Sequence, residues 1–189
     1  VALGDSISGA AVVLEQDIPE NMQSDHLPAI KDGNTGKNAN NEGGTNKSVW
    51  TNYKNSNEGN DNKAEIIMGY DTQVVLGEIV IHFFEDSYSA RFPDANKTKI
   101  YVAETKNGPW TQVQAKEQIG TAKDGIKPYT YKLDAPVSAT FIKFELTNKD
   151  EQLDGRKPCT GITEIELKKA TTSFKTNTTA ELGKLTVNG

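Results

Sequence analysis

The segment with the clearest potential for chemistry is residues 31–34, which read KDGN and open a long stretch rich in asparagine and glycine. It combines the carboxylate of Asp32 and the amide of Asn34 with the backbone carbonyls of a glycine-containing turn. A hard cation such as Ca²⁺ takes about six to eight oxygen ligands of this mixed kind. The segment therefore supplies donors suited to calcium, although Asp32 and Gly33 also fit an ordinary surface turn.

A second set of side chains has the chemistry of a sugar-binding site. A pyranose needs a flat aromatic surface for its apolar face, and planar or charged side chains that form hydrogen bonds with its hydroxyls. The candidates in predicted loops and at their ends are Trp50, Tyr53, Tyr88, Arg91, Phe92, Asp154, Arg156 and Lys157. Structural roles compete with this interpretation: Trp50 also suits the core, Phe92 can anchor its loop, and either arginine can be an ordinary surface residue.

Sequence motifs for catalysis are lacking. The two histidines, His26 and His82, are far apart, and the chain has no H-E-x-x-H, C-x-x-C, G-x-S-x-G or phosphate-loop motif. A glycosidase would need two carboxylates about 5 to 10 Å apart, such as Glu85 or Asp86 with Asp154. Acidic residues are numerous and nothing singles out one pair, so we predict that the chain is not an enzyme.

Composition limits the classes of partner. The chain has 189 residues, a mass of 20.6 kDa, a formal net charge of -5 and a pI near 5.1. It has no basic stripe that would neutralise phosphates, so we predict no nucleic-acid and no membrane partner. A single cysteine, Cys159, excludes an internal disulfide, which argues against a small disulfide-stapled domain and remains compatible with bacterial export.

Alternating apolar and polar residues mark the middle and end of the chain as β-strands. The pattern is clearest in ATFIKFELTN, residues 139–148. Similar patterns occupy residues 72–86, 98–105 and 161–169. Turn dipeptides expected to reverse the chain are Asn107-Gly108, Asp124-Gly125 and Asp154-Gly155. Short strands with frequent turns predict an all-β fold, an antiparallel sandwich or barrel with little helix.

The predicted organisation is one main domain with two flanking segments. Residues 1–24 form a lead-in strand and turn, residues 25–168 the β-domain, and residues 169–189 a linker and the start of a following module. Within the domain, the polar segment 55–63 and the connection 84–97 are longer than a hairpin needs, which indicates functional loops. The insertion 35–47 either reaches the ligand face or covers a sheet edge.

Five parts of the sequence, in order, carry a resemblance to a known family. They are AIKDGN followed by SVW, AEIIMGYDTQVVLGEIVIHF, KIYVAETKNGPWTQV, APVSATFIKFELT and GITEIEL, which together cover about residues 25–168. The chain resembles the discoidin or coagulation factor V/VIII C-type family, a galactose-binding-like β-sandwich (jelly roll) used by many carbohydrate-binding modules. One departure is the segment from Asn34 to Trp50, which is longer than in most family members.

The resemblance implies a structural calcium ion. In similar modules the ligands are the carbonyl before the aspartate of the turn, that aspartate, the residue after its glycine, a hydroxyl residue two before the tryptophan, and a glutamate of the last strand. At the matching positions of this sequence these are Lys31, Asp32, Asn34, Ser48 and Glu164.

The resemblance also implies a function. The threonine-rich end and LTVNG resemble module junctions of Gram-positive cell-surface glycosidases, such as a cell-wall β-galactosidase. We therefore expect a non-catalytic, lectin-like module, monomeric within a larger secreted or cell-wall-attached bacterial chain. Its expected partner is a galactose-terminated glycan, such as galactose, lactose or N-acetyllactosamine. The alternative is a protein-binding adhesion domain on the same fold, because function resides in the loops.

Overall fold

The computed structural model describes residues 2–18, 26–36, 48–54 and 62–171. In these residues the chain forms nine β-strands and two short 3-10 helices. The strands are β1 (Ala2–Ser6), β2 (Val13–Gln16), β3 (Trp50–Thr51), β4 (Lys63–Phe84), β5 (Lys99–Ala103), β6 (Thr111–Gln112), β7 (Ala115–Ile119), β8 (Ile126–Thr147) and β9 (Gly161–Thr171). The helices are η1 (Ser8–Ala10) and η2 (Leu27–Lys31).

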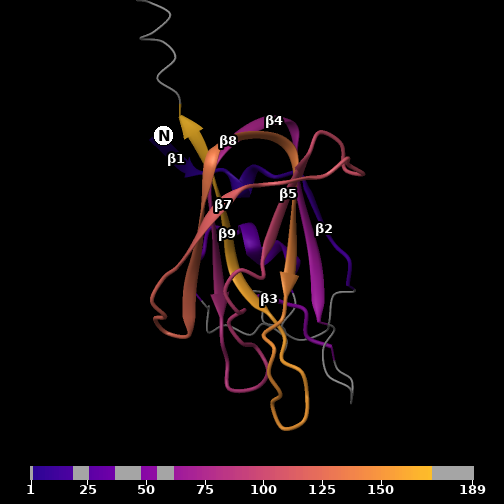
Figure 1. Cartoon of the computed structure of the whole chain (residues 1–189), viewed down its shortest axis with the longest axis vertical. Helices are drawn as coiled ribbons and strands as arrows, with labels where there is room; N and C mark the ends of the chain where they lie inside the picture. Colours follow the sequence, from indigo (N-terminus) through magenta and orange to yellow (C-terminus); the bar gives the residue numbers. More distant parts are fainter. Residues whose placement is uncertain (1, 19–25, 37–47, 55–61, 172–189) are drawn as a thin grey trace, which may run out of the picture.

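Two long strands, β4 and β8, build both layers of a β-sandwich. They pair antiparallel along most of their lengths and arch together over one end of the molecule in Figure 1. The first layer contains β2, the first half of β4, the second half of β8, β5 and β6. The second layer contains β1, β9, the other halves of β4 and β8, and β7, and β3 pairs with the start of β9. The prediction of an antiparallel, all-β sandwich is confirmed.

The bend in β4 has a local cause. Its register against β8 shifts between Gly69 and Val74 and again between Leu76 and Glu78, and such irregularities increase the bend of a strand. Residues 64–83 therefore belong to one bent strand that serves both layers.

The core lies between the layers and follows the two-residue period of the strands. On β8, Ile142 and Phe144 are fully buried, whereas Lys143 between them faces outward. Ile66 of β4 lies opposite Phe144, and its side chain is likewise fully buried. Helix η2 adds Leu27 and Ile30 to this core and packs against β9, β2 and β3.

Two of the predicted turns are two-residue hairpins. Asp124 and Gly125 have φ angles of 53° and 75°, and Asp154 and Gly155 have φ angles of 49° and 77°. Positive φ at both positions suits the twist of a two-residue hairpin and explains the aspartate-glycine pairs. The predicted chain reversals at these positions are confirmed by the bridges on either side of each turn.

The sandwich extends beyond the predicted boundary at residue 25. Strands β1 and β2 pair with β9 and β4, so they are part of the two layers instead of a separate lead-in. Strand β9 continues to Thr171. Residues 172–189 of the predicted linker and following module (169–189), residues 37–47 of the insertion 35–47, and most of the polar loop 55–63 lie outside the described residues. The helices of the described residues are two short 3-10 turns, and neither could span a membrane.

Candidate functional site

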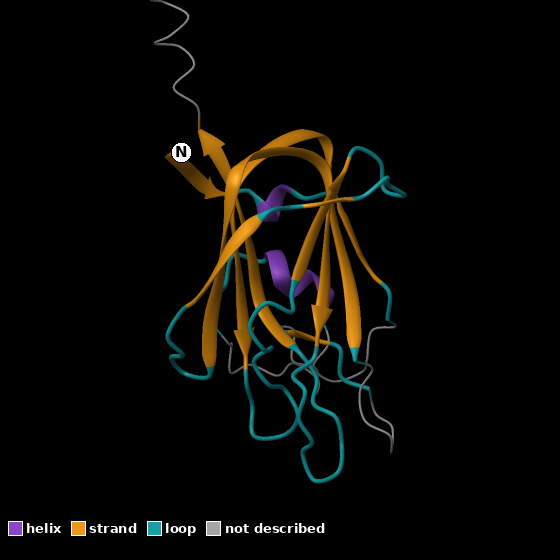
Figure 2. Cartoon of the chain, viewed as in Figure 1, coloured by secondary structure: helices purple, strands orange, loops and turns teal. Residues whose placement is uncertain are grey.

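Long loops gather at the end of the sandwich opposite the arches. Figure 2 shows in teal the connection from β4 to β5 and the connection from β8 to β9 at this end. The two loops touch through their backbones: Arg91 N–H donates to the carbonyl of Cys159 at 3.0 Å, and Cys159 N–H donates to the carbonyl of Ser89 at 2.9 Å. These bonds form a parallel bridge that fixes one loop beside the other.

The β4–β5 loop is held in shape by its own acidic residues. Oδ1 of Asp86 accepts hydrogen bonds from the N–H groups of Tyr88, Ser89 and Ala90 at 3.0, 2.8 and 3.0 Å. Glu85 accepts one from the N–H of Phe92. The two carboxylates weighed for glycoside hydrolysis therefore act as backbone acceptors that order this loop.

Ion pairs add two further connections between the loops. The guanidinium of Arg91 donates to the carbonyl of Asp86 and to that of Ala90, and its Nε lies 3.4 Å from a carboxylate oxygen of Glu151. Lys149 pairs with Asp94 at 3.1 Å. A hydrogen bond from the N–H of Asp150, together with Lys149, lowers the pKa of the Asp94 carboxyl. Arg91, predicted as a sugar ligand, is thus engaged in positioning the loops.

A buried polar network lies beneath these loops. Asn52 donates through Nδ2 to Oδ1 of Asn148 at 2.9 Å, and its own Oδ1 accepts the N–H of Thr160 at 2.7 Å. Asn148 also accepts from the Thr160 hydroxyl and donates to the carbonyl of Pro158. Sequence reasoning missed this network, because buried asparagines have no periodic signature.

Replacing Asn148 by alanine should test this role. The change leaves the amide of Asn52 and the hydroxyl of Thr160 without the acceptor that they share, which should cost about 1–3 kcal/mol. Chemical denaturation measures the loss, and alanine at the exposed, nearby Asp150 is the matched control. Equal stability of the two variants would show that the network does not hold the loops.

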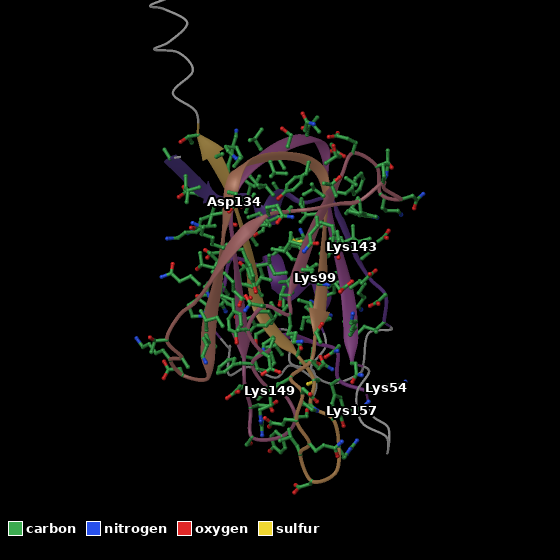
Figure 3. The ribbon with its side chains drawn as sticks, in the orientation of Figure 1. Lys54, Lys99, Asp134, Lys143, Lys149 and Lys157 are labelled. Carbon is green, nitrogen blue, oxygen red and sulfur yellow. The ribbon has the colours of Figure 1, made fainter. Side chains whose placement is uncertain are left out.

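Several exposed side chains lie at the loop end of the molecule. Tyr88 is 85% exposed although its loop backbone is fixed. In the neighbouring loop Asp154, Arg156 and Lys157 are exposed at and after the hairpin turn. Figure 3 places the labelled Lys157 and Lys149 at this end. The predicted site residues Tyr88, Asp154 and Arg156 therefore lie where a ligand could reach them.

The assignment of Trp50 to the sugar-binding surface is wrong. Its side chain is fully buried in the core, and its indole N–H donates to Oε1 of Gln16 at 2.7 Å. The reason is that β3 pairs with β9, opposite Ile162, which directs the ring between the layers.

Two other predicted aromatic ligands are partly withdrawn from solvent. Phe92 packs against the main core, with the ammonium of Lys127 4.6 Å from its ring centre. Tyr53 packs against a small cluster beneath the loops that includes Phe84 and Cys159. Both rings support the loops, as the structural alternative for Phe92 anticipated.

The KDGN turn and the last strand meet, as predicted. The N–H of Gly33 donates to Oε2 of Glu164 at 2.6 Å, although the two residues are 131 positions apart. Glu164 is 2% exposed and its other oxygen, Oε1, is buried with no hydrogen-bond partner among the described residues. Oδ1 of Asp32 accepts the N–H of Asn34, which closes the turn.

The electrostatic environment of Asp32 and Glu164 favours a bound cation. Burial raises the pKa of Glu164 to about 8, and repulsion from Asp32 and Glu166 adds to the rise, against the hydrogen bond from Gly33. Loss of solvent also raises the pKa of Asp32 above its ordinary value. A buried carboxylate oxygen that no group in the described part of the chain donates to, close to a second carboxylate, fits the oxygen ligands that Ca²⁺ takes.

Two other predicted calcium ligands, Ser48 and Lys31, lie near the KDGN turn in the sheet register or in the chain. Ser48 is buried, and the antiparallel register of Trp50 with Ile162 brings it near the level of Glu164. Lys31 is the last residue of η2 and directly precedes Asp32. No group of three or more His, Cys, Asp or Glu side chains suited to a metal occurs in the described ranges, so most ligands would be amide, hydroxyl and backbone oxygens.

His82 has the structural role expected of a strand residue. It lies in β4, and its Nε2 is 2.9 Å from Oε2 of Glu166 on the neighbouring β9. Both side chains are on the outer face of the second layer, and His82 lies two residues before β4 ends at Phe84, at the loop end of the strand.

Comparisons with solved structures identify the fold. A family 32 carbohydrate-binding module of Clostridium perfringens NanJ, in complex with galactose, aligns with a TM-score of 0.58 at 18% identity, over 87% of this chain and 98% of that one. A structure from the Streptococcus pneumoniae β-galactosidase BgaA aligns with a TM-score of 0.57 at 14% identity, over 84% and 91%. The Clostridium perfringens module CpGH89CBM32-5, in complex with GalNAc-β-1,3-galactose, gives 0.55 at 12% identity, over 88% and 100%.

These similarities establish the class of fold. The chain has the discoidin-like β-sandwich seen in family 32 carbohydrate-binding modules, which confirms the resemblance inferred from its sequence. No protein-family model and no curated protein sequence matches it.

Proposed function

We propose that this chain is a non-catalytic carbohydrate-binding module that binds galactose-containing glycans through the loop end. The observation that carries the proposal is Tyr88, a ring 85% exposed on a loop whose backbone is held by Asp86. Arg156 is exposed on the adjoining loop. An exposed ring on one loop and a planar, charged donor on the adjoining loop would provide the stacking surface and the hydrogen-bonding fork that a hexose requires.

The choice of galactose rests on the structural neighbours. The NanJ module is in complex with galactose, and CpGH89CBM32-5 with GalNAc-β-1,3-galactose. A shallow contact with one or two sugars corresponds to a dissociation constant near micromolar to millimolar, about 4 to 8 kcal/mol. Within a larger, extracellular bacterial glycosidase, several such modules would raise the overall avidity.

Calcium has a structural role in this proposal. The carboxylates of Asp32 and Glu164, the side chain of Asn34, the hydroxyl of Ser48 and the carbonyl of Lys31 would hold it. When bound, the ion supplies positive charge that balances the two carboxylates. The chain itself contributes the hydrogen bond from Gly33 to Glu164, which already joins the turn to β9.

Replacing Tyr88 by alanine should weaken binding of lactose on the order of tenfold, because the stacking surface is removed. Isothermal titration with lactose measures the change. Tyr88→Phe keeps the ring and should retain most of the affinity. The melting temperature should stay the same in both variants, because this side chain makes little contact with the fold.

A glycan array, with and without free galactose and with and without a calcium chelator, tests the ligand class. Binding that galactose competes away supports the proposal. Binding to a protein that persists after its glycans are removed would instead assign the loops to protein adhesion. Turnover of aryl-glycosides by the isolated chain would contradict a non-catalytic role.

A further inference from the structure

The outer face of the first layer carries a group of side chains used neither by the core nor by the loop end. We name Lys99, Tyr101, Lys143 and Trp110 the aromatic–lysine strip. Tyr101 of β5 lies opposite Lys143 of β8, and Lys99 is two residues before Tyr101 on the same outward face. The intervening residues of both strands face the core, for example the buried Ile100 and Ile142.

Three side chains of the strip contact one another. The ammonium of Lys143 is 4.6 Å from the ring centre of Trp110 and 5.1 Å from that of Tyr101. Two rings beside one cation hold it by electrostatic attraction to their faces. Both rings remain partly exposed. Figure 3 shows the labelled Lys99 and Lys143 near one another on the same side of the molecule.

Around the strip, Lys63, Lys99 and Lys143 share the outward face with Glu145, which lies opposite Lys99, and with Glu65, which lies opposite Glu145, so positive charge is in slight excess. Lys63 pairs with Glu145 and Lys106 pairs with Glu15 on this layer. Within the described residues, neither Lys99 nor Lys143 forms an ion pair with a carboxylate. The outward face of an antiparallel sheet is normally polar, so partly exposed aromatic rings beside two lysines without an ion pair in the described chain suit a ligand with both an apolar face and negative charge.

We propose that the aromatic–lysine strip is a second glycan-binding surface, which takes an acidic sugar of a polysaccharide. The partly exposed rings contact the apolar face of the pyranose, and Lys99 and Lys143 pair with its carboxylate or sulfate. Two lysines suit a single acidic group, whereas nucleic acids are held by many more cations. Since Lys99 directly follows the β4–β5 loop, the surface begins at the loop end and continues along β5.

Titration of the whole chain with hyaluronan and with chondroitin sulfate tests this inference, and lactose serves as the neutral ligand. Hyaluronan carries only carboxylates, so the two polymers separate carboxylate recognition from sulfate recognition. Lys143→Gln and Lys99→Gln should each weaken binding of the acidic polymer about threefold, and added NaCl should weaken it further. Trp110→Ala should weaken it about fivefold or more. Affinity for lactose should be unchanged in all three variants.

Lys132→Gln is the matched control, since Lys132 is an exposed lysine of β8 in the other layer. Lys143→Gln leaves the buried core intact, so the test remains valid if Trp110→Ala folds poorly. Three results would overturn the proposal: no binding of either acidic polymer, equal effects of Lys132→Gln and Lys143→Gln, or self-association that Trp110→Ala abolishes. Acidic-polymer binding lost in Tyr88→Ala but not in Lys143→Gln would place that ligand at the loop end. Loss of lactose binding alone counts against the proposed function and leaves this one standing.

Discussion

Replacing Trp50 by alanine is expected to lower the free energy of unfolding by about 3–5 kcal/mol. The side chain is fully buried, so the change opens a cavity between the layers and leaves Gln16 without its indole donor. Urea denaturation followed by circular dichroism measures the loss. Sugar affinity of the remaining folded molecules should equal that of the wild type, because the indole does not reach the loop surface.

Trp110→Ala provides the matched control, since it removes the same side chain from a partly exposed position. It should cost clearly less stability than Trp50→Ala. The core assignment of Trp50 fails if Trp50→Ala keeps wild-type stability and loses lactose affinity. That pair of results would restore the sugar-binding role that the sequence suggested.

Glu164→Gln is expected to remove the stabilising response to calcium. In the wild type, free Ca²⁺ at about 100 times its dissociation constant should add about 2.7 kcal/mol to the free energy of unfolding. Glutamine keeps an oxygen that accepts the hydrogen bond from Gly33 but carries no charge for the ion. Thermal melts in calcium and in chelator, with Glu166→Gln as the control from the same strand, measure the difference.

A wild-type melting temperature that is the same in calcium and in chelator, with no ion bound in a titration, would eliminate the proposed metal site. A calcium response that survives in Glu164→Gln would show that the ion binds at another place in the chain.

Stability in chelator should also depend on pH through Glu164. The ordinary pKa of a glutamate is 4.5, and the folded chain raises it to about 8. The folded state therefore favours the protonated carboxyl, so the penalty is absent below about pH 4.5 and grows as the pH rises to about 8. The total is on the order of a few kcal/mol. Glu164→Gln in chelator should lack this decline and be the more stable protein at pH 8.

Much of the fold could be predicted from the sequence because the signals are local. The alternation in ATFIKFELTN depends only on the two-residue period of a strand that has one buried face. Asp124-Gly125 and Asp154-Gly155 predict tight turns because both positions need positive φ. These local rules do not state that β4 is one bent strand, or that β1 and β2 complete the layers, because pairing partners are distant in sequence.

The candidate site, like the fold, could be predicted only in part from the sequence. The sequence by itself identified the KDGN turn, the long β4–β5 connection and the exposed residues Tyr88 and Arg156, because residue type and turn chemistry mark them. Only the tertiary structure decided that Trp50 faces the core and that Arg91 holds two loops together. It also decided that Gly33 and Glu164 meet across 131 positions. The physical reason is that burial and electrostatic environment come from packing of distant segments, which no local pattern contains.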